Sequence, residues 1–191
     1  MRPKLKLLDD DLIERIISEA RDVLCNVGVE IHNPPLLEML SDHGAKVDAT
    51  GSRARLTPQI LDAAIASAPS TVELYDAHGV LTHTLAGDAV YFTPGSAAIS
   101  ILDPDGHESR PPDTTDYVRY AKLVGGLDQL ASQSTAMIPA DVPERVSDSY
   151  RLYLSLLHSA KPVVTGAFTA EAFSVMRDLQ LAVRGSRDNL E

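Results

Sequence analysis

The 191-residue sequence has no tryptophan, one cysteine and fewer basic than acidic residues. Because Cys25 is the only cysteine, an intramolecular disulfide framework is excluded. The 17 lysines and arginines are scattered among 27 acidic residues, and the net charge is −10. A surface that binds nucleic acid needs clustered cations to neutralise phosphates. The composition therefore indicates a chain without structural disulfides and without a nucleic-acid partner.

Long apolar runs are also missing. No stretch approaches the roughly 18 apolar residues that a membrane-spanning helix requires. The basic residues near the N-terminus are not followed by an apolar core, so the sequence does not predict a signal peptide. The expected location is the cytoplasm. Cys25 lies in an amphipathic helical pattern, where a free cysteine is more often a small buried hydrophobic residue than a nucleophile.

Several catalytic and ligand-binding motifs are absent. The six histidines include no pair at HxxxH spacing, and no CxxC occurs, so the sequence predicts no metal site. It contains neither the glycine-rich phosphate motifs nor the GxSxG elbow of serine hydrolases. Motifs alone assign no reaction and no catalytic residue.

The first part of the chain, residues 1–110, reads as a mixed α+β region. Apolar residues at helical spacing predict a helix over 9–26, and the predicted cap residues Asn33 and Thr57 precede helices over 36–43 and 59–67. Alternating patterns predict short strands, which form a pair around Thr50 and Gly51 and a clearer hairpin around residues 76–79. The strand segments are 29–31, 45–48, 53–56, 72–75, 81–85, 89–92 and 98–102.

The second part, residues 111–191, alternates helix and apolar strand. Helices are expected over 114–124, 145–159 and 170–184, with strands over 130–137 and 162–168. This rhythm is typical of a parallel sheet covered by helices. A closed barrel of this kind needs eight units and about 250 residues. The predicted fold is therefore α/β: an N-terminal α+β region followed by about two units of an incomplete (β/α)8 barrel.

Active sites of such barrels lie where the strands end. This rule selects Gln133 on the first strand, Asp141 in its following loop, and Thr165 and Phe168 at the end of the second strand. Asp141 lies between Pro139 and Pro143, which would limit its mobility. It could orient a cationic substrate or act as an acid or base, but an aspartate before Val-Pro-Glu is more typical of a helix cap or turn former.

Short sequence pieces along nearly the whole chain resemble the trimethylamine methyltransferase family in the same order. In the first half they are Val27-Gly28-Val29, Asn33-Pro34, His43-Gly44-Ala45-Lys46-Val47-Asp48, Leu56-Thr57-Pro58 and Ala66-Ser67-Ala68-Pro69-Ser70. Later pieces are Tyr91-Phe92-Thr93-Pro94-Gly95, Arg110-Pro111-Pro112-Asp113-Thr114-Thr115-Asp116-Tyr117, Asp141-Val142-Pro143 and Lys161-Pro162-Val163-Val164-Thr165-Gly166-Ala167-Phe168-Thr169.

The resemblance implies a barrel enzyme that moves a methyl group from a methylated amine or betaine to the cobalt of a corrinoid carried by a separate protein. Holding a quaternary ammonium suits aromatic faces and a carboxylate, so Tyr91, Phe168 and Asp141 are candidates for binding the substrate. Proteins of this family are longer, and their catalytic region lies beyond residue 191. The resemblance therefore implies a truncated chain that is inactive alone.

Two alternatives remain open. A non-catalytic remnant could survive as a binding module that forms homo-oligomers through its unfinished sheet. A small α/β enzyme unrelated to the family is the other. The interpretation as a truncated methyltransferase predicts that the isolated chain shows no methyl transfer from methylamines or betaines to reduced cobalamin.

Overall fold

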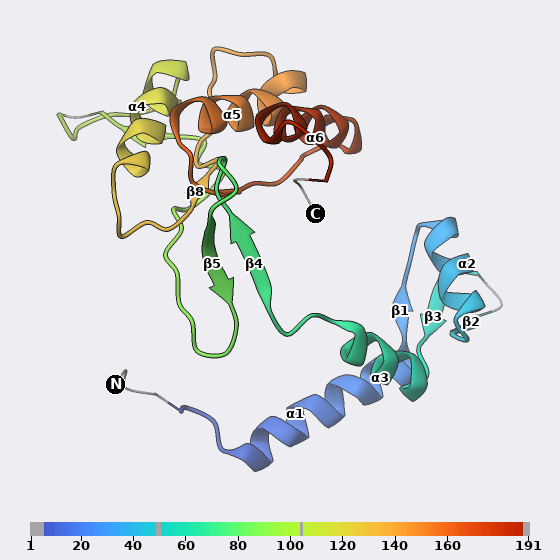
Figure 1. The fold of residues 1–191 in the computed structure, drawn as a ribbon. Helices are drawn as coiled ribbons and strands as arrows, with labels where there is room; N and C mark the ends of the chain where they lie inside the picture. The colour runs from blue at the N-terminus through green and yellow to red at the C-terminus, as the bar shows by residue number, and fades with distance from the viewer. Residues whose placement is uncertain (1–5, 49–50, 104, 189–191) are drawn as a thin grey trace. The chain divides into compact units, whose positions relative to one another are not determined.

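The computed structural model describes residues 6–48, 51–103 and 105–188 (Figure 1). The chain divides into two compact units, and the boundary in the sequence falls between Pro69 and Ser70. The predicted division at residue 110 lies within the second unit, between a short hairpin and the first of three helices. Each unit is described separately below.

The first unit begins with helix α1 (Asp10–Asp22), as the spacing of apolar residues predicts. The Asp9 carboxylate caps it by accepting from the Leu12 N–H at 2.7 Å. The helix then widens into one π-helical turn, η1 (Val23–Val27), and Gly28 ends it with φ 79°. A Cβ atom at Gly28 would lie 2.5 Å from the carbonyl oxygen of Ala54, so only glycine fits this close approach.

A small antiparallel sheet follows, in the order β1–β3–β2. Its strands are β1 (Val29–Glu30), β2 (Lys46–Val47) and β3 (Arg53–Arg55), and the central residue Ala54 is fully buried. The predicted pairing of residues 45–48 with 53–56 is confirmed. Thr50, in the predicted turn between them, lies outside the described residues.

Helices α2 (Pro34–Asp42) and α3 (Pro58–Ser67) start with the same local device. Asn33 accepts from the Leu36 N–H at 3.0 Å, and Thr57 accepts from the Ile60 N–H at 3.4 Å. Proline follows each cap, where its missing N–H costs no helical hydrogen bond. Both predicted caps are confirmed.

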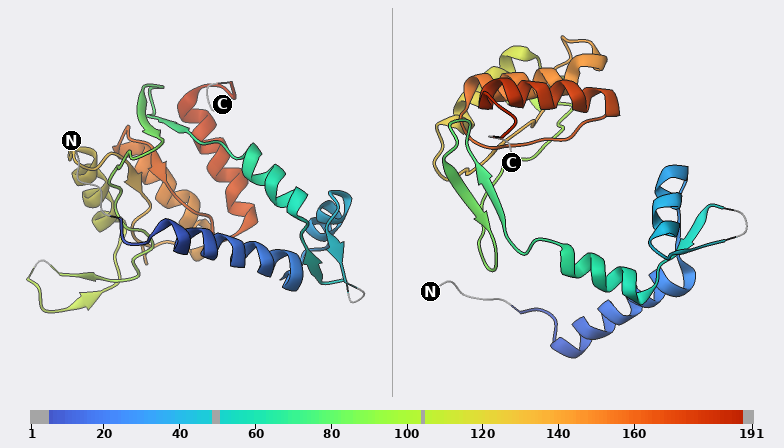
Figure 2. Two further views of the ribbon diagram at one scale, coloured as in Figure 1. Left: turned by 90° about the horizontal axis from the view of Figure 1, so that it is seen from below. Right: turned by 45° about the vertical axis from the view of Figure 1, so that its right-hand side comes forward.

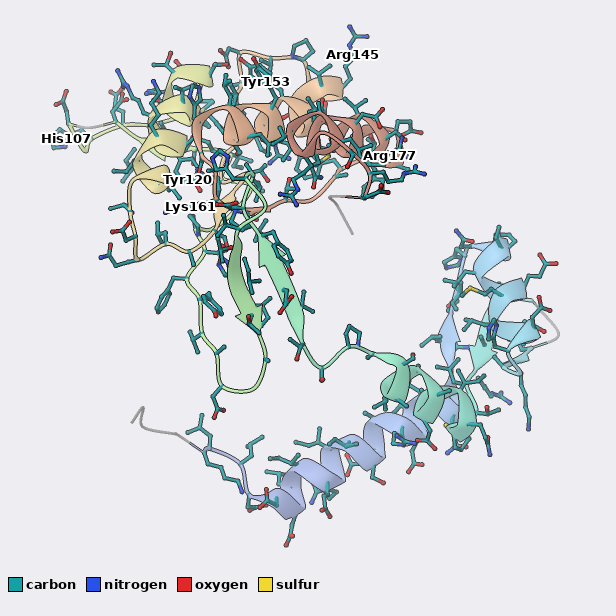
Figure 3. All side chains as sticks on the ribbon, in the orientation of Figure 1. His107, Tyr120, Arg145, Tyr153, Lys161 and Arg177 are labelled. Atoms are coloured by element: carbon teal, nitrogen blue, oxygen red, sulfur yellow. The ribbon has the colours of Figure 1, made fainter. Side chains whose placement is uncertain are left out.

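The second unit contains two hairpins. The first, β4 (Val72–Tyr75) with β5 (Leu81–Leu85), was predicted from alternation, and its turn is held by Asp76, whose Oδ1 accepts from the N–H groups of His78 and Val80. The second, β6 (Ile101–Leu102) with β7 (Ser109–Arg110), projects from the unit (Figure 2). His107 lies at its outer end (Figure 3).

Helices and strands then alternate as predicted: α4 (Thr114–Gly125), β8 (Gln133–Ser134), α5 (Glu144–His158), β9 (Val163–Val164) and α6 (Ala170–Arg184). Strands β8 and β9 pair in parallel, so α5 is the crossover of a β–α–β unit. Both strands are shorter than the sequence predicts, because regular pairing stops after two residues in each.

A third extended segment, residues 92–98, runs parallel to β8 on its other side. The Ala131 N–H donates to the Phe92 carbonyl at 2.9 Å, and the Ala98 N–H donates to the Ala136 carbonyl at 2.8 Å. Ala98 and Met137 form a parallel bridge. The layer therefore has three parallel segments, each followed by a helix, and it begins upstream of residue 111. Figure 1 shows α4, α5 and α6 on one side of these segments, in agreement with the predicted α/β class.

The buried apolar core of this unit lies between α4 and α5. Tyr117 and Ala121 from α4 pack against Leu154 from α5. The Tyr117 hydroxyl bonds the Ser155 hydroxyl at 2.8 Å, which satisfies it inside the core. Burial raises the pKa of Tyr117 to about 12.

An ionic cluster joins the projecting β6–β7 hairpin to the start of α4. Arg110 pairs with Asp103 at 2.6 Å and with Asp116 at 2.7 Å. Asp116 also forms a capping box with Asp113 at the helix N-terminus. Hydrogen bonding from Arg110 lowers the pKa of Asp116 to about 2.

Candidate functional site

Two threonines lie directly after the parallel strands, at the carboxyl ends of β8 and β9. The Thr165 hydroxyl donates to the Gly166 carbonyl at 3.4 Å, so it accepts from the Thr135 hydroxyl at 3.0 Å. The two strand ends are therefore tied together by side chains where the backbone pairing ends. Thr135 is buried, and Thr165 is half-buried.

A buried ion pair on α5 adjoins the threonines. The Asp148 Oδ1 and Arg151 Nη2 atoms are 2.5 Å apart, and the two side chains are only 5% and 3% exposed. Arg151 also donates from Nη1 to the Thr135 carbonyl at 3.2 Å. A charge pair removed from water is tolerated only when its remaining polar atoms are also bonded, and this pair meets that condition through its neighbours.

The ion pair holds the loop between β9 and α6. The second carboxylate oxygen of Asp148 accepts from the Phe168 N–H, and the Arg151 guanidinium lies 4.9 Å from the centre of the Phe168 ring. The Phe168 residue is nevertheless 62% exposed. One helix, one strand end and one loop thus present an aromatic ring to solvent above a neutral pair of buried charges.

Sequence reasoning missed Asp148 and Arg151. The signal was present, because the inward-facing stripe of an amphipathic helix is normally apolar. On α5 the buried residues are instead mostly polar: Ser147, Asp148, Arg151, Leu152, Leu154 and Ser155. The Ser147 hydroxyl is buried without a hydrogen-bond partner among the described residues. Charged residues on such a stripe indicate a site or a buried pair.

Of the residues predicted from sequence, Thr165 and Phe168 come together in this cluster. Gln133 is adjacent in sequence to Ser134 but uses its side chain differently. Its Nε2 donates to the Ala121 carbonyl at 3.0 Å, and its Oε1 accepts from the Ser134 N–H at 3.2 Å. Gln133 therefore fastens β8 to α4 and has no exposed polar atom, since the residue is fully buried.

Asp141 occupies the helix-capping role that the sequence left open. Its Oδ1 accepts from the Thr114 N–H at 3.0 Å, at the first turn of α4. A carboxylate there also faces the positive end of the helix dipole. The capped helix is α4, which lies earlier in the chain, and not the helix that follows Asp141.

Tyr91 lies away from Thr165 and Phe168, at the amino ends of the strands. Its ring packs against His83 with the ring centres 4.5 Å apart, and its hydroxyl accepts from the Thr84 N–H at 3.3 Å. His83 in turn bonds Ser132, the residue that precedes β8, at 3.1 Å. The structure thus attaches Tyr91 to the β4–β5 hairpin.

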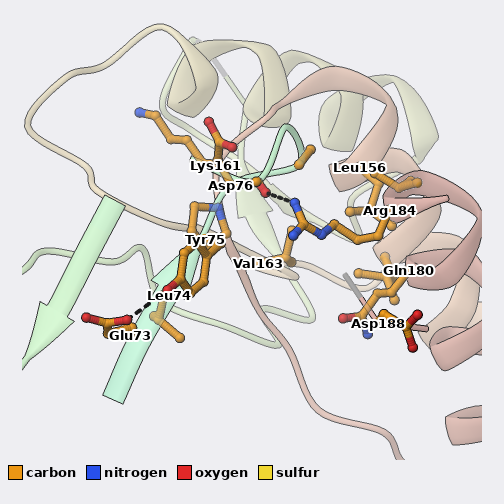
Figure 4. Close-up of a pocket in the computed structure, with 15 residues that line it drawn as sticks. Glu73, Leu74, Tyr75, Asp76, Leu156, Lys161, Val163, Gln180, Arg184 and Asp188 are labelled. Atoms are coloured by element: carbon orange, nitrogen blue, oxygen red, sulfur yellow. Dashed lines mark hydrogen bonds between the residues drawn. The ribbon is translucent and has the colours of Figure 1, made fainter. Parts of the chain in front are cut away.

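The same amino ends border a cavity of about 510 Å³ between the β4–β5 hairpin, α5, α6 and the start of β9 (Figure 4). Charged side chains on its walls bond to the chain itself. Arg184 donates to the Asp76 carbonyl at 3.2 Å, and the Tyr75 hydroxyl donates to Glu73 at 2.7 Å.

Lys161, on the wall of this cavity, has all three ammonium protons engaged. Its Nζ donates to the carbonyls of Val124, Leu127 and Leu130 at 2.7, 2.6 and 2.7 Å. These carbonyls belong to the end of α4 and the loop that leads to β8. Lys161 therefore satisfies helix-terminal carbonyls and fixes that loop against the start of β9.

A second cavity, of about 440 Å³, lies in the first unit beside η1 and the start of α3. Its walls include Arg21, Lys46 and Arg55 together with Cys25. Arg21 is paired with Asp62 on α3. Cys25 is half-buried and not fully enclosed, so the expected buried position is only partly reached.

Within residues 6–48, 51–103 and 105–188, no three histidine, cysteine, aspartate or glutamate side chains gather in a way that could hold a metal ion. Among the helices described there, none has the length and apolar character needed to cross a membrane.

Comparison with known proteins gives consistent matches along the whole chain. The family model described as trimethylamine methyltransferase matches residues 1–189. A glycine betaine methyltransferase of Desulfitobacterium hafniense (strain Y51) is 28% identical over 187 residues, which cover 97% of this chain and 38% of that protein. The trimethylamine methyltransferase MttB of D. hafniense (strain DSM 10664 / DCB-2) is 25% identical over 181 residues, covering 95% of this chain and 36% of that protein.

An L-carnitine:corrinoid methyltransferase of Eubacterium limosum is 29% identical over 157 residues, which cover 80% of this chain and 31% of that protein. The chain therefore spans less than two-fifths of the length of these curated relatives.

Proposed function

This chain belongs to the trimethylamine methyltransferase family, and we propose that it takes part in moving a methyl group from a methylated amine or betaine to the corrinoid of a separate protein. The names of its relatives support both parts of this proposal: they act on glycine betaine, trimethylamine and L-carnitine, and one is a corrinoid methyltransferase. The methyl donor is a small molecule with three or four carbon substituents on nitrogen.

The observation that carries the proposal is the cluster at the carboxyl ends of β8 and β9. The face of an aromatic ring attracts a quaternary ammonium, and Phe168 offers such a ring on a residue that is 62% exposed. The hydroxyls of Thr135 and Thr165 bond each other at the strand ends, and the Thr135 carbonyl accepts from Arg151, which lies over the ring. In this proposal the chain binds and orients the donor so that one methyl group faces the acceptor.

We assign no donor contact to Gln133, Asp141 or Tyr91. The amide of Gln133 and the carboxylate of Asp141 are bonded to the backbone of α4, and Tyr91 is packed on the hairpin at the opposite ends of the strands. Their proposed part is structural: Gln133 and Asp141 hold α4, and Tyr91 holds the β4–β5 hairpin.

The three parallel segments, each followed by a helix on the same side, support the proposal that this chain supplies the first units of a (β/α)8 barrel. The proposed barrel region comprises residues 111–191 and, by its parallel pairing, residues 92–98. Further units would come from the part of a family-length protein that this chain does not span. The corrinoid, carried by the partner protein, supplies the acceptor of the methyl group.

Donor binding can be tested by titrating the chain with glycine betaine and trimethylamine and following heat or ligand nuclear magnetic resonance signals. We expect saturable binding that Phe168→Ala abolishes. Phe173→Ala is the matched control, because Phe173 is an equally exposed phenylalanine on α6, at 64%. Absence of binding, or an equal loss in both variants, would contradict the proposed site.

Methyl transfer tests the second part of the proposal. We expect methylation of reduced cobalamin by a family-length protein that contains this chain, and none by the 191-residue chain alone. Turnover by the chain alone would show that it holds a whole site. If the family-length protein binds donors but never methylates cobalamin, the chain belongs to a binding module and not to a methyltransferase.

A further inference from the structure

The ring of Phe168 is already in contact with one cation. The Arg151 guanidinium lies over one face, 4.9 Å from the ring centre, while most of the side chain is exposed to solvent. A guanidinium keeps its charge at every physiological pH. An ammonium group that approached the free face of the ring would therefore meet a second positive charge beneath it, unless a nearby group cancels that charge.

Asp148 is the group that cancels it. Its Oδ1 lies 2.5 Å from Arg151 Nη2, and both side chains are almost completely buried, so water does little to screen either charge. Its Oδ2 accepts from the Phe168 N–H, which fixes the backbone that carries the ring. The Asp148 carboxylate thus has two effects: it fixes the backbone that carries the Phe168 ring, and it neutralises the Arg151 charge beneath that ring.

We infer that Asp148 is a positioning residue for the methyl donor: it holds Phe168 over Arg151 and neutralises the guanidinium, so that the free face of the ring accepts a quaternary ammonium. This inference rests on the proposed function, because it takes Phe168 as the donor-binding ring. The ligand class it specifies is a methylated ammonium cation whose charge lies against the outer face of Phe168.

The variant Asp148→Asn separates charge from shape, since an amide oxygen can still accept from the Phe168 N–H. The probes are choline and 3,3-dimethyl-1-butanol, which has the same shape but no charge. An uncompensated charge several ångströms away weakens cation binding by roughly tenfold at intermediate effective dielectric. We therefore expect about a tenfold loss of choline affinity and little change for the alcohol.

Equal losses for choline and the alcohol would indicate only a structural role for Asp148 and would overturn the inference. Unchanged binding of both probes would overturn it as well. Asp178→Asn is the matched control, because Asp178 pairs with Arg177 on the exposed surface of α6 (Figure 3) and should leave both affinities unchanged.

A double variant guards against misfolding of the single one, because breaking one half of a buried pair is strongly destabilising. Asp148→Asn combined with Arg151→Met leaves no net charge beneath the ring. We expect its preference for choline over the alcohol to return toward the wild-type value. A double variant that discriminates as poorly as the single variant would contradict the electrostatic role.

Amide hydrogen exchange at Phe168 gives a readout that needs no ligand. With Asp148→Ala the Phe168 N–H loses its acceptor, and its exchange should accelerate while that of Ala172, bonded to Thr169 at 3.2 Å, stays the same. Unchanged exchange at Phe168 would disprove the positioning role even if donors bind. Failure of wild-type protein to bind choline, with normal exchange effects, would instead contradict the proposed function.

Discussion

The two ends of the parallel strands use similar residues in different ways. At the amino ends, the polar groups of Lys161, His83 and Arg184 bond to other parts of the chain and lock the hairpin, α4 and β9 together. At the carboxyl ends, a buried ion pair holds an exposed phenylalanine, and two threonine hydroxyls join the strand ends. The polar groups at the amino ends hold the fold together, and the carboxyl ends expose the ring that the proposed function takes as the donor-binding surface.

The largest effect is expected at the carboxyl ends, from Arg151→Met. It leaves Asp148 buried without a partner, and breaking one member of such a pair typically costs about 3–5 kcal/mol of unfolding free energy. Chemical denaturation measures it. Arg177→Met, which removes an exposed pair, should cost less than about 1 kcal/mol. If both variants lose the same small amount, the buried pair does not support the site.

At the amino ends, Lys161→Met should have the next largest effect. The substitution removes three charge-assisted hydrogen bonds to carbonyls that are partly shielded from water, so we expect a loss of about 2–3 kcal/mol. Thermal and denaturant unfolding give the value. The control Lys122→Met, at an exposed position on α4, should change stability little. A loss of stability no greater than that of the control would show that Lys161 does not stabilise the amino ends of the strands.

The Arg110 cluster predicts a pH dependence in the acid range. The pKa of Asp116 is lowered from 3.8 to about 2, chiefly by its hydrogen bond to Arg110. Because the folded form holds the lower pKa, this stabilisation is complete above pH 3.8 and is lost as the pH falls through about 2. Titration of the Asp116 carboxyl carbon by nuclear magnetic resonance should show a midpoint near 2, which Arg110→Gln moves back toward 3.8. A wild-type midpoint near 3.8 would contradict the cluster.

The smallest predicted effect concerns His83 at the amino ends. The Thr82 hydroxyl donates its proton to the Leu74 carbonyl at 3.1 Å and therefore accepts from His83 Nδ1, at 2.7 Å. His83 Nε2 is thus unprotonated and accepts from Ser132 at 3.1 Å. Burial lowers the pKa of His83 below 6.5, so its contribution to stability is present above pH 6.5 and is lost as the pH falls through the lower, folded value.

Melting temperatures between pH 5 and pH 8 check this sign. Wild-type protein should lose stability toward pH 5, and His83→Gln should flatten that part of the profile. A wild-type melting temperature that rises on acidification would show that the imidazole is charged in the fold.

Local sequence signals were sufficient for the helices, the β2–β3 pairing and the β4–β5 hairpin, but they gave no strand for β7. Asn33, Thr57, Asp113 and Thr169 all cap the helices that were expected after them, because a side-chain acceptor at a helix start acts within three residues. The parallel pairing of β8 with β9 also followed from the strand–helix rhythm. The caps depend on near neighbours in sequence, whereas the pairing of β8 with β9 joins residues 30 positions apart and was predicted from the order of the elements.

What could not be predicted depends on contacts between distant residues. Residues 92–98 were not recognised as a parallel segment, because Pro94 and Gly95 interrupt the pattern and the pairing partner lies about 40 positions later. Asp141 was considered as a cap of the helix that follows it, but it bonds the first turn of α4 at Thr114, 27 residues earlier. In the candidate site, Phe168 and Thr165 were found by their place at a strand end, whereas Asp148 and Arg151 required knowledge of which face of α5 is buried.

The most direct test maps a methyl donor onto the chain by nuclear magnetic resonance. Glycine betaine added to isotope-labelled protein should shift the signals of Thr135, Thr165 and Phe168 at the carboxyl ends. Signals from the walls of the 510 Å³ cavity, such as those of Glu73 and Tyr75, should stay in place. Shifts confined to that cavity would place the donor at the amino ends and would contradict the division between a stabilising end and a binding end.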